Sequence, residues 1–452
     1  MERVFEHIDR HLEEYIRWLE DLCRVPSISS RGEGLVNAAS VVAKLLRDLG
    51  VEPHTVHVPG APAALIAEVI GAASRTLLLY NHYDVVPPDP VANWTHPPFS
   101  PQIRDGRIFA RGTADNKGDL VARIAAVSAY RNVHGTLTAS VKFLIEGEEE
   151  IGSPHLSKLV ESNRGLLAAH ACFGEGGYKD AQGHPEVTLG IRGRANLLLE
   201  AKGAKQSFHS SLTSIVPNPT WDVVWALASI KDRTERVLVD GFYDDALLPT
   251  TDELACLDRI AFDEQGTLER LGLHAFTLDV RGRDLMRRLL FEPTCEVAAF
   301  GAGEWLDKLQ GMPRRAVATV RFGLVPNQDP DKMSTLLRRH LDRHGYKHLE
   351  ITLQSARHPG RTPLNDPFAQ LVISSVRTVY GIEPVIYPVA PVLGGIPIHE
   401  VSEPLGIPSA SFGVSSPESQ WHGPDESIGL KDFSQGIKAI AQLIHDFAAT
   451  GG

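Results

Sequence analysis

The feature that most constrains the fold of this chain is a set of short apolar segments that end in histidine or carboxylate residues. Residues 76–80 form one such run, and His82 and Asp84 follow it. Comparable positions occur later in the chain, at Asp115, Glu149, Glu150, Glu175 and His422. Buried parallel strands read as continuous apolar runs, and open α/β sheets bind ligands at the carboxyl ends of their strands. We therefore expect a sheet with one edge that gathers these side chains.

The alternation of helix-like and strand-like segments predicts an α/β fold in two domains. A chain of 452 residues with 43% hydrophobic residues is long enough for both. Residues 1–193 and 358–452 predict a catalytic, metal-binding domain with a mixed, mainly parallel sheet and helices on both faces. Residues 194–357 predict a smaller α+β unit inserted into that domain. The opening amphipathic pattern predicts a single helix over residues 4–22.

The charge pattern favours a small-molecule partner and offers no surface for nucleic acid or an anionic membrane. The 45 Lys and Arg residues against 56 Asp and Glu residues give a net charge of -11, without a long cationic run. Cys23, Cys172, Cys256 and Cys295 form no Cys-x-x-Cys pair, which indicates reduced thiols and no thiolate zinc site. The charged start of the chain and the lack of a long apolar segment predict a cytoplasmic protein.

The residues after the apolar runs have the chemistry of a divalent-metal site. The spacing of His82 and Asp84 lets the histidine face a metal with one ring nitrogen while the aspartate braces the other. Asp115 can bridge two cations with its two oxygens, although it could instead cap the helix that follows. Four acids between residues 146 and 150 repel one another unless cations neutralise them, the alternative being a solvated acidic turn.

Two later positions complete this set of metal-binding groups. Glu175 follows a short apolar run and is flanked by glycines, with Asp180 as the alternative, and His422 adds a second imidazole. Histidine and carboxylate groups without thiolates suit two divalent ions, of which zinc is expected and cobalt or manganese are alternatives.

The order and spacing of these motifs resemble a known family of enzymes. The match covers residues 82–87, 94, 98–101, 105–107, 111–118, 149–153, 208–210, 217–219, 324–330 and 422–426. The family is that of the dinuclear zinc metallopeptidases and deacylases, with carnosinase-type dipeptidases, carboxypeptidase G, aminoacylase, acetylornithine deacetylase and succinyl-diaminopimelate desuccinylase. The resemblance implies an inserted domain that acts as a lid and holds a homodimer together.

The resemblance also assigns the metal ligands. It implies that His82, Asp115 and Glu175 hold one ion, whereas Asp115, Glu150 and His422 hold the other, so that Asp115 bridges the pair. It further implies a cis peptide bond directly after the bridging aspartate.

The resemblance assigns the catalytic and substrate-binding groups as well. Glu149, rather than Glu148, is implied to be the general base toward water, and Asp84 supports the histidine ligand. His209 is implied to stabilise the oxyanion in the active site of the partner subunit, with Asn218 also near the substrate; otherwise His209 only shapes a turn on the lid.

Two departures from the family concern the substrate. Relatives that bind a free carboxylate commonly have Arg where this chain has Gly323, and often Ser or Thr where it has Gly395, next to Gly394. We therefore expect a substrate other than an ordinary dipeptide with a free α-carboxylate, unless Arg321 or Arg315 replaces the missing guanidinium.

The leading function is thus a dinuclear metal-dependent hydrolase of an amide bond in a small substrate, similar to a dipeptidase, carboxypeptidase or N-acyl amino acid deacylase. One alternative is an amidohydrolase or aminohydrolase of a small non-peptide compound. Another is a noncatalytic metal-binding relative, which the presence of Glu149 disfavours. A two-metal phosphoesterase is disfavoured by the acidic balance and the lack of a cationic phosphate loop.

Overall fold

A six-stranded sheet forms the centre of the catalytic domain. The computed structural model describes residues 1–206, 208–302, 313–391 and 396–449. The sheet has the order β1-β2-β6-β3-β7-β16. Its parallel part comprises β6 (Ser140–Glu146), β3 (Thr76–His82), β7 (Ala171–Phe173) and β16 (Ser409–Ala410), and its antiparallel edge comprises β2 (Ala64–Val69) and β1 (His54–Val56). The predicted mixed, mainly parallel sheet is confirmed.

Helices cover both faces of this sheet, as predicted. Leu77 and Leu79 of β3 face one buried cluster, whereas Leu78 and Tyr80 face another, as expected for a strand buried on both sides. The first face is covered by α1 (Glu2–Arg10), α2 (Leu12–Cys23), α3 (Leu35–Asp48), α4 (Lys117–His134), α12 (Pro367–Tyr380) and α14 (Leu430–Phe447). The second face is covered by α5 (Leu156–Ser162), α6 (Arg164–Leu167), a π-helical turn (Ile398–Ser402) and α13 (Glu403–Leu405).

The single helix predicted over residues 4–22 is wrong. The structure divides it at His11, where φ is -106° and ψ is 13°. The division allows α1 to pack on α4 and α14 while α2 packs on α4 and α3. Apolar spacing alone could not reveal this change of partner, because both helices continue the same pattern.

Three small sheets tie the late part of the chain to the early part. β17 (Ser427–Gly429) pairs with β5 (Arg107–Phe109), which pairs with β4 (Gln102–Arg104). β8 (Glu186–Thr188) pairs with β15 (Val385–Tyr387), and β9 (Gly190–Ile191) pairs with β14 (Gly360–Arg361). These pairs surround the carboxyl edge of the central sheet, where the candidate residues lie.

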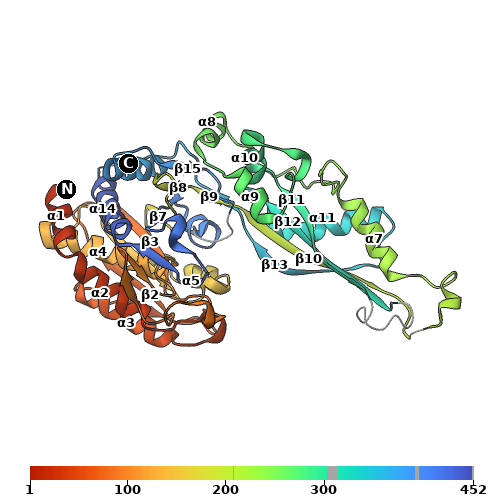
Figure 1. Cartoon of the computed structure of the whole chain (residues 1–452), viewed down its shortest axis with the longest axis horizontal. Helices are drawn as coiled ribbons and strands as arrows, with labels where there is room; N and C mark the ends of the chain where they lie inside the picture. The colour runs from red at the N-terminus through yellow and green to blue at the C-terminus, as the bar shows by residue number, and fades with distance from the viewer. Residues whose placement is uncertain (207, 303–312, 392–395, 450–452) are drawn as a thin grey trace.

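The second unit contains an antiparallel sheet of order β11-β12-β10-β13 and extends away from the catalytic domain (Figure 1). Its strands are β11 (Thr294–Ala302), β12 (Arg315–Leu324), β10 (Gly193–Lys202) and β13 (Glu350–Arg357). Alternate residues of β10 pack against α7 (Pro219–Ile230) and α11 (Pro330–Arg343), which cover one face of the sheet. The other face carries polar residues near the catalytic domain.

Within the second unit, residues 251–291 form a helical arm whose role the sequence left open. Its helices are α8 (Thr251–Cys256), α9 (Glu264–Leu271) and α10 (Gly282–Phe291), with two short 3-10 turns between them. The arm shares a hydrophobic cluster with Val385 and Val389 of the catalytic domain. A buried ion pair between Arg361 and Glu253, 2.9 Å long, holds the same contact. The arm therefore connects the inserted unit to the catalytic domain next to β15 (Figure 1).

No helix among the described residues combines the length and the apolarity needed to cross a lipid bilayer.

Candidate functional site

The carboxyl ends of three neighbouring strands deliver the first candidate residues to one place. His82 is the last residue of β3, Glu149 and Glu150 follow β6, and Glu175 follows β7. Asp115 and His422 lie on longer loops. The sequence had suggested that every candidate directly follows a strand of the central sheet, and this does not hold for these two residues. Asp115 precedes α4, and His422 lies between β16 and β17.

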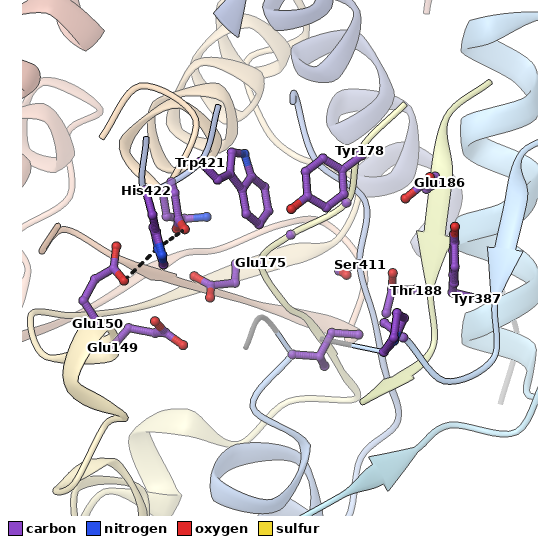
Figure 2. Close-up of a pocket in the computed structure, with 17 residues that line it drawn as sticks. Glu149, Glu150, Glu175, Tyr178, Glu186, Thr188, Tyr387, Ser411, Trp421 and His422 are labelled. Carbon is purple, nitrogen blue, oxygen red and sulfur yellow. Dashed lines mark hydrogen bonds and ion pairs between the residues drawn. The ribbon is translucent and has the colours of Figure 1, made fainter. Parts of the chain in front are cut away.

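Asp115 lies between the two histidines and faces each with a different oxygen. Its Oδ1 is 3.2 Å from His82 Nε2, and its Oδ2 is 3.1 Å from His422 Nε2. Glu175 Oε2 lies 3.1 Å from His82 Nε2. Glu150 Oε2 lies 3.2 Å from His422 Nε2 (Figure 2). Two groups, each with one histidine and one glutamate, thus share a single aspartate. The peptide bond Asp115–Asn116 is cis, as the resemblance implied.

Asp84 fixes both a histidine and the acidic turn. Its Oδ1 lies 3.2 Å from His82 Nδ1, which leaves Nε2 of that ring directed at the other carboxylates. The same carboxylate accepts hydrogen bonds from the backbone N–H groups of Glu149 and Glu150, each at 3.1 Å. One fully buried aspartate therefore aligns side chains from two strands.

The two adjacent glutamates Glu148 and Glu149 point to different surroundings. Glu148 accepts hydrogen bonds from the backbone and the ring of His155 and is thereby occupied. Glu149 lines the cavity beside Glu150 and Glu175, and its nearest cationic neighbour is Arg357, with Nη2 at 3.7 Å from Oε1.

The electrostatics of this cluster are those of a site that requires cations. Burial raises the pKa of Glu149 and Glu175, and burial together with Asp115 raises that of Glu150 to about 7. Hydrogen bonds to Asp115 and Glu150 raise the pKa of His422 to about 10. Crowded carboxylates are costly in a region of low dielectric constant unless positive charge compensates them.

The residues present fit a pair of divalent ions. His82, Asp115 and Glu150 offer ligand atoms within 4.8 Å of one another, as do His82, Glu149 and Glu175. Glu150 Oε1 is buried and has no hydrogen-bond partner among the described residues, so a lone pair is available. Imidazole and carboxylate ligands without sulfur match zinc, cobalt or manganese.

Glu426 holds the loop that carries Asp115, a role that the sequence did not reveal. This fully buried carboxylate accepts hydrogen bonds from the backbone N–H groups of Gly112, Ala114 and Asp115 at 2.8, 2.8 and 3.0 Å. It also pairs with buried Arg111 at 2.7 Å. Its position four residues after His422 was visible in the sequence, but its partners were not.

Arg123 joins the ends of two strands beneath the site. From α4 this buried guanidinium donates hydrogen bonds to the carbonyl oxygens of Tyr80, Phe173 and Gly174, which end β3 and β7. Asp119, one turn earlier, accepts a hydrogen bond from Val414 N–H at 3.0 Å. A pair of buried charges in an otherwise apolar helix was the available signal, and it was missed.

A cavity of about 500 Å³ opens beside these residues. Its lining includes Asp115, Glu149, Glu150, Glu175 and His422 at one end. Ile396 and Pro391 also line it, and Glu186, Thr188, Tyr387 and Ser411 lie away from the carboxylate cluster, beyond Trp421 and Tyr178 (Figure 2). The space is large enough for a small substrate.

His209 and Asn218, two of the predicted substrate-binding residues, lie away from this cavity. Neither His209 nor Asn218 lines this cavity: His209 lies 3.0 Å from Ser211 in an exposed turn, and Asn218 caps α7 by accepting a hydrogen bond from Thr220 N–H. Gly394 and Gly395 lie outside the described residues.

The two arginines considered as substitutes at Gly323 differ in position. Arg315 begins β12 at the end remote from Gly323 and pairs with Glu200 at 2.6 Å. Arg321 lines a second cavity of about 440 Å³ together with Arg194 and Gly323. A Cβ at Gly323 would lie only 2.5 Å from Thr294 Oγ1, so a side chain at this position would require Thr294 to move.

Comparison with known proteins decides the family. The model of peptidase family M20/M25/M40 matches residues 78–446. The chain belongs to this family. Human Beta-Ala-His dipeptidase is 27% identical, over 99% of this chain and 93% of the relative. The structure of the M20 family metallo-carboxypeptidase Sso-CP2 from Sulfolobus solfataricus matches with a TM-score of 0.87 and 34% identity, covering 96% of this chain and 99% of that one.

Membership of the M20 family makes the chain a metal-dependent hydrolase of amide bonds, as predicted. It favours the hydrolase over the noncatalytic alternative. A dinuclear metal-binding M20 peptidase from Bacillus subtilis shares the fold with a TM-score of 0.62 at 14% identity, covering 98% of this chain and 99% of that chain.

Proposed function

We propose that this M20 enzyme hydrolyses short peptides with two divalent ions, zinc in the first place, held by His82, Asp115, Glu150, Glu175 and His422. The observation that supports this proposal is the sharing of Asp115 between two histidines, with one further glutamate beside each. Relatives that match nearly the whole chain are dipeptidases and a metallo-carboxypeptidase, which favours a peptide over a non-peptide amide.

Glu149 acts as the general base in this proposal. When bound, the two ions lower the pKa of water and polarise the scissile carbonyl group. Glu149 accepts a proton from the attacking water and passes it to the leaving nitrogen, so the C–N bond breaks as the amine departs. Burial raises its pKa, which suits a group that must both accept and return a proton near neutral pH. Asp84 keeps the base in place through the backbone of the acidic turn.

Arg321 and Arg194 are proposed to bind the C-terminal carboxylate of the peptide. Both line the second cavity, which shares Pro391 with the catalytic cavity. Burial and the neighbouring Arg321 and Arg357 lower the pKa of Arg194, so an anion between these residues would relieve their mutual repulsion. With Arg321 in place of the missing guanidinium, an ordinary dipeptide with a free α-carboxylate can be a substrate. Arg321→Met should raise KM for Ala-Ala more than for its C-terminal amide.

The inserted domain is proposed to form a homodimer that supplies His209 to the partner's active site. Trp221 and Trp225 stack at 5.3 Å on α7, and each is 53% exposed, which is unusual for a monomer surface. His209 lies on the same unit and outside its own chain's cavity.

A mixing experiment tests this arrangement. His209→Ala and Glu149→Gln variants should each be inactive as homodimers. After subunit exchange at equal amounts, activity should return to about a quarter of the parental value, because half of the dimers contain one intact site. Mixtures without any recovered activity would contradict a contribution of His209 across the dimer.

Hydrolysis itself is tested with Glu149→Gln and a panel of dipeptides, N-acyl amino acids and simple amides. The variant should keep both metal ions by elemental analysis while kcat falls by about 100-fold or more. Glu148→Gln is the matched control, because that side chain is bound to His155. Parental rates in Glu149→Gln would exclude it as the base, and a metal-loaded parent that cleaves only non-peptide amides would favour the alternative function.

The four cysteines are free in the structure. We therefore also propose a reducing, cytoplasmic location for the enzyme. Fractionation of cells that produce the protein tests this location.

A further inference from the structure

The wall of the catalytic cavity away from the metal ligands carries a carboxylate that the proposed reaction does not use. Glu186 and Thr188 belong to β8, and alternate residues of a strand point to the same side, here into the cavity. Val187 between them is fully buried on the opposite side. Figure 2 shows Glu186 and Tyr387 well apart from Glu149, Glu150 and His422.

Glu186 has no cationic partner among the described residues. No hydrogen bond or ion pair involves its carboxylate, although its backbone N–H is satisfied by Tyr178 O at 2.8 Å. The cationic groups close in sequence are already occupied: Lys179 pairs with Asp432, and His184 pairs with Asp180. The described residues therefore offer no charged partner to this partly buried side chain.

Burial makes the negative charge of Glu186 costly. Burial and the charge of Asp180 raise its pKa to about 7. A carboxylate in such a position gains most from a cation that displaces water and donates hydrogen bonds. Glu186 also lines an adjoining cavity of about 520 Å³ with Asp180, Asp263 and Lys179, the last of which is paired with Asp432.

The surroundings suit an amphipathic cationic group. Tyr387 pairs in register with Thr188 across the two strands, and Tyr178 and Ser411 line the same cavity. Aromatic rings can cover the methylene stem of a lysine or arginine and attract its charge, while hydroxyl groups accept additional hydrogen bonds. On the other side, the cavity shares Pro391 with the arginine-lined cavity. The two charged regions could therefore orient a peptide, with its cationic end at Glu186 and its carboxylate at the arginines.

We propose that Glu186 binds a cationic group on the acyl side of the scissile bond and makes the enzyme favour peptides whose N-terminal residue carries that cation. This inference rests on the proposed peptidase function. The cation is an ammonium or guanidinium, and it can belong to the side chain or to the α-amine of that residue. Glu186 is thus a specificity-determining residue that leaves the hydrolytic step to the metal-site residues.

Matched substrates separate binding of a side-chain ammonium from binding of the α-amine. Lys-Ala and norleucine-Ala differ in the side-chain ammonium, and norleucine-Ala and its N-acetyl form differ in the α-amine. The parent should have a higher kcat/KM for Lys-Ala than for norleucine-Ala. Glu186→Gln should lower kcat/KM for Lys-Ala by about 10- to 100-fold, while the value for norleucine-Ala stays within about threefold. If the α-amine is bound instead, the variant should abolish discrimination between norleucine-Ala and its N-acetyl form.

The controls distinguish this inference from the proposed function. Glu161→Gln removes one negative charge from an exposed position of α5 and should leave kcat/KM for all three substrates unchanged. Circular dichroism and metal content establish that Glu186→Gln is folded and loaded. Cleavage of all the peptides, with equal effects of Glu186→Gln on each, would overturn only the role of Glu186. A metal-loaded parent that cleaves none of them would overturn both proposals.

Discussion

Replacement of Glu426 by glutamine is expected to weaken both the fold and the metal centre, although this residue is not a proposed ligand. Its carboxylate accepts three backbone hydrogen bonds from the loop that ends at Asp115 and pairs with Arg111 at 2.7 Å. Glutamine at this position would point its NH₂ group, a donor, at backbone N–H groups that are also donors. It would also leave the guanidinium of Arg111 without a negatively charged partner. Both residues of the pair are at most 2% exposed in their side chains, so water cannot replace the lost partner.

The magnitude follows from these contacts. Removal of one partner from a buried ion pair costs about 3–5 kcal/mol. We therefore expect Glu426→Gln to lower the free energy of unfolding of the metal-free protein by about that amount. Because the loop positions the bridging carboxylate of Asp115, metal affinity should fall by about 10- to 100-fold, the usual effect of losing a group that orients a ligand.

Urea unfolding followed by tryptophan fluorescence measures the first effect, and competition with a zinc-binding dye measures the second. Asp425→Asn is the matched control, because the adjacent Asp425 bonds Thr95 at the protein surface and asparagine can keep these contacts. The control should change the free energy of unfolding by less than about 1 kcal/mol. If Glu426→Gln unfolds at the parental urea concentration and binds zinc with parental affinity, the assigned role of Glu426 is wrong.

Three further predictions concern the same region. Chelation of the metal ions should lower the thermal unfolding midpoint, because Glu149, Glu150 and Glu175 then remain crowded without compensating charge; an unchanged midpoint in calorimetry would contradict this. Gly118→Ala places a Cβ 2.1 Å from Thr113 O and should destabilise the protein by about 1–3 kcal/mol in urea unfolding, whereas Gly165→Ala meets nothing within 4 Å and should be neutral or slightly stabilising. Burial raises the pKa of Asp119 from 3.8 to about 7, so its contribution to stability is fully present below pH 3.8 and is lost as the pH rises through about 7. The free energy of unfolding should fall less between pH 5 and pH 8 in Asp119→Asn than in the parent. An identical pH dependence in variant and parent would refute the raised pKa of Asp119.

The sequence by itself predicted those parts of the molecule in which chemistry and periodicity are local. The apolar runs predicted the central strands, and the alternation of helix-like and strand-like segments predicted the α/β fold. The metal-binding residues were candidates because histidines and carboxylates after apolar runs are chemically distinctive. Local pattern failed at His11, where a change of packing partner divides a helix.

Tertiary structure decided everything that depends on residues distant in the chain. Glu426 and Ala114 are hydrogen-bonded although 312 positions separate them, and no local signal specifies that contact. The packing of the arm on Val385, the pairing of Arg315 with Glu200 and the exposure of Glu186 to the catalytic cavity likewise arise only after folding. The physical reason is that a side chain's type is encoded locally, whereas its partner, its burial and hence its charge state are set by the elements that pack around it.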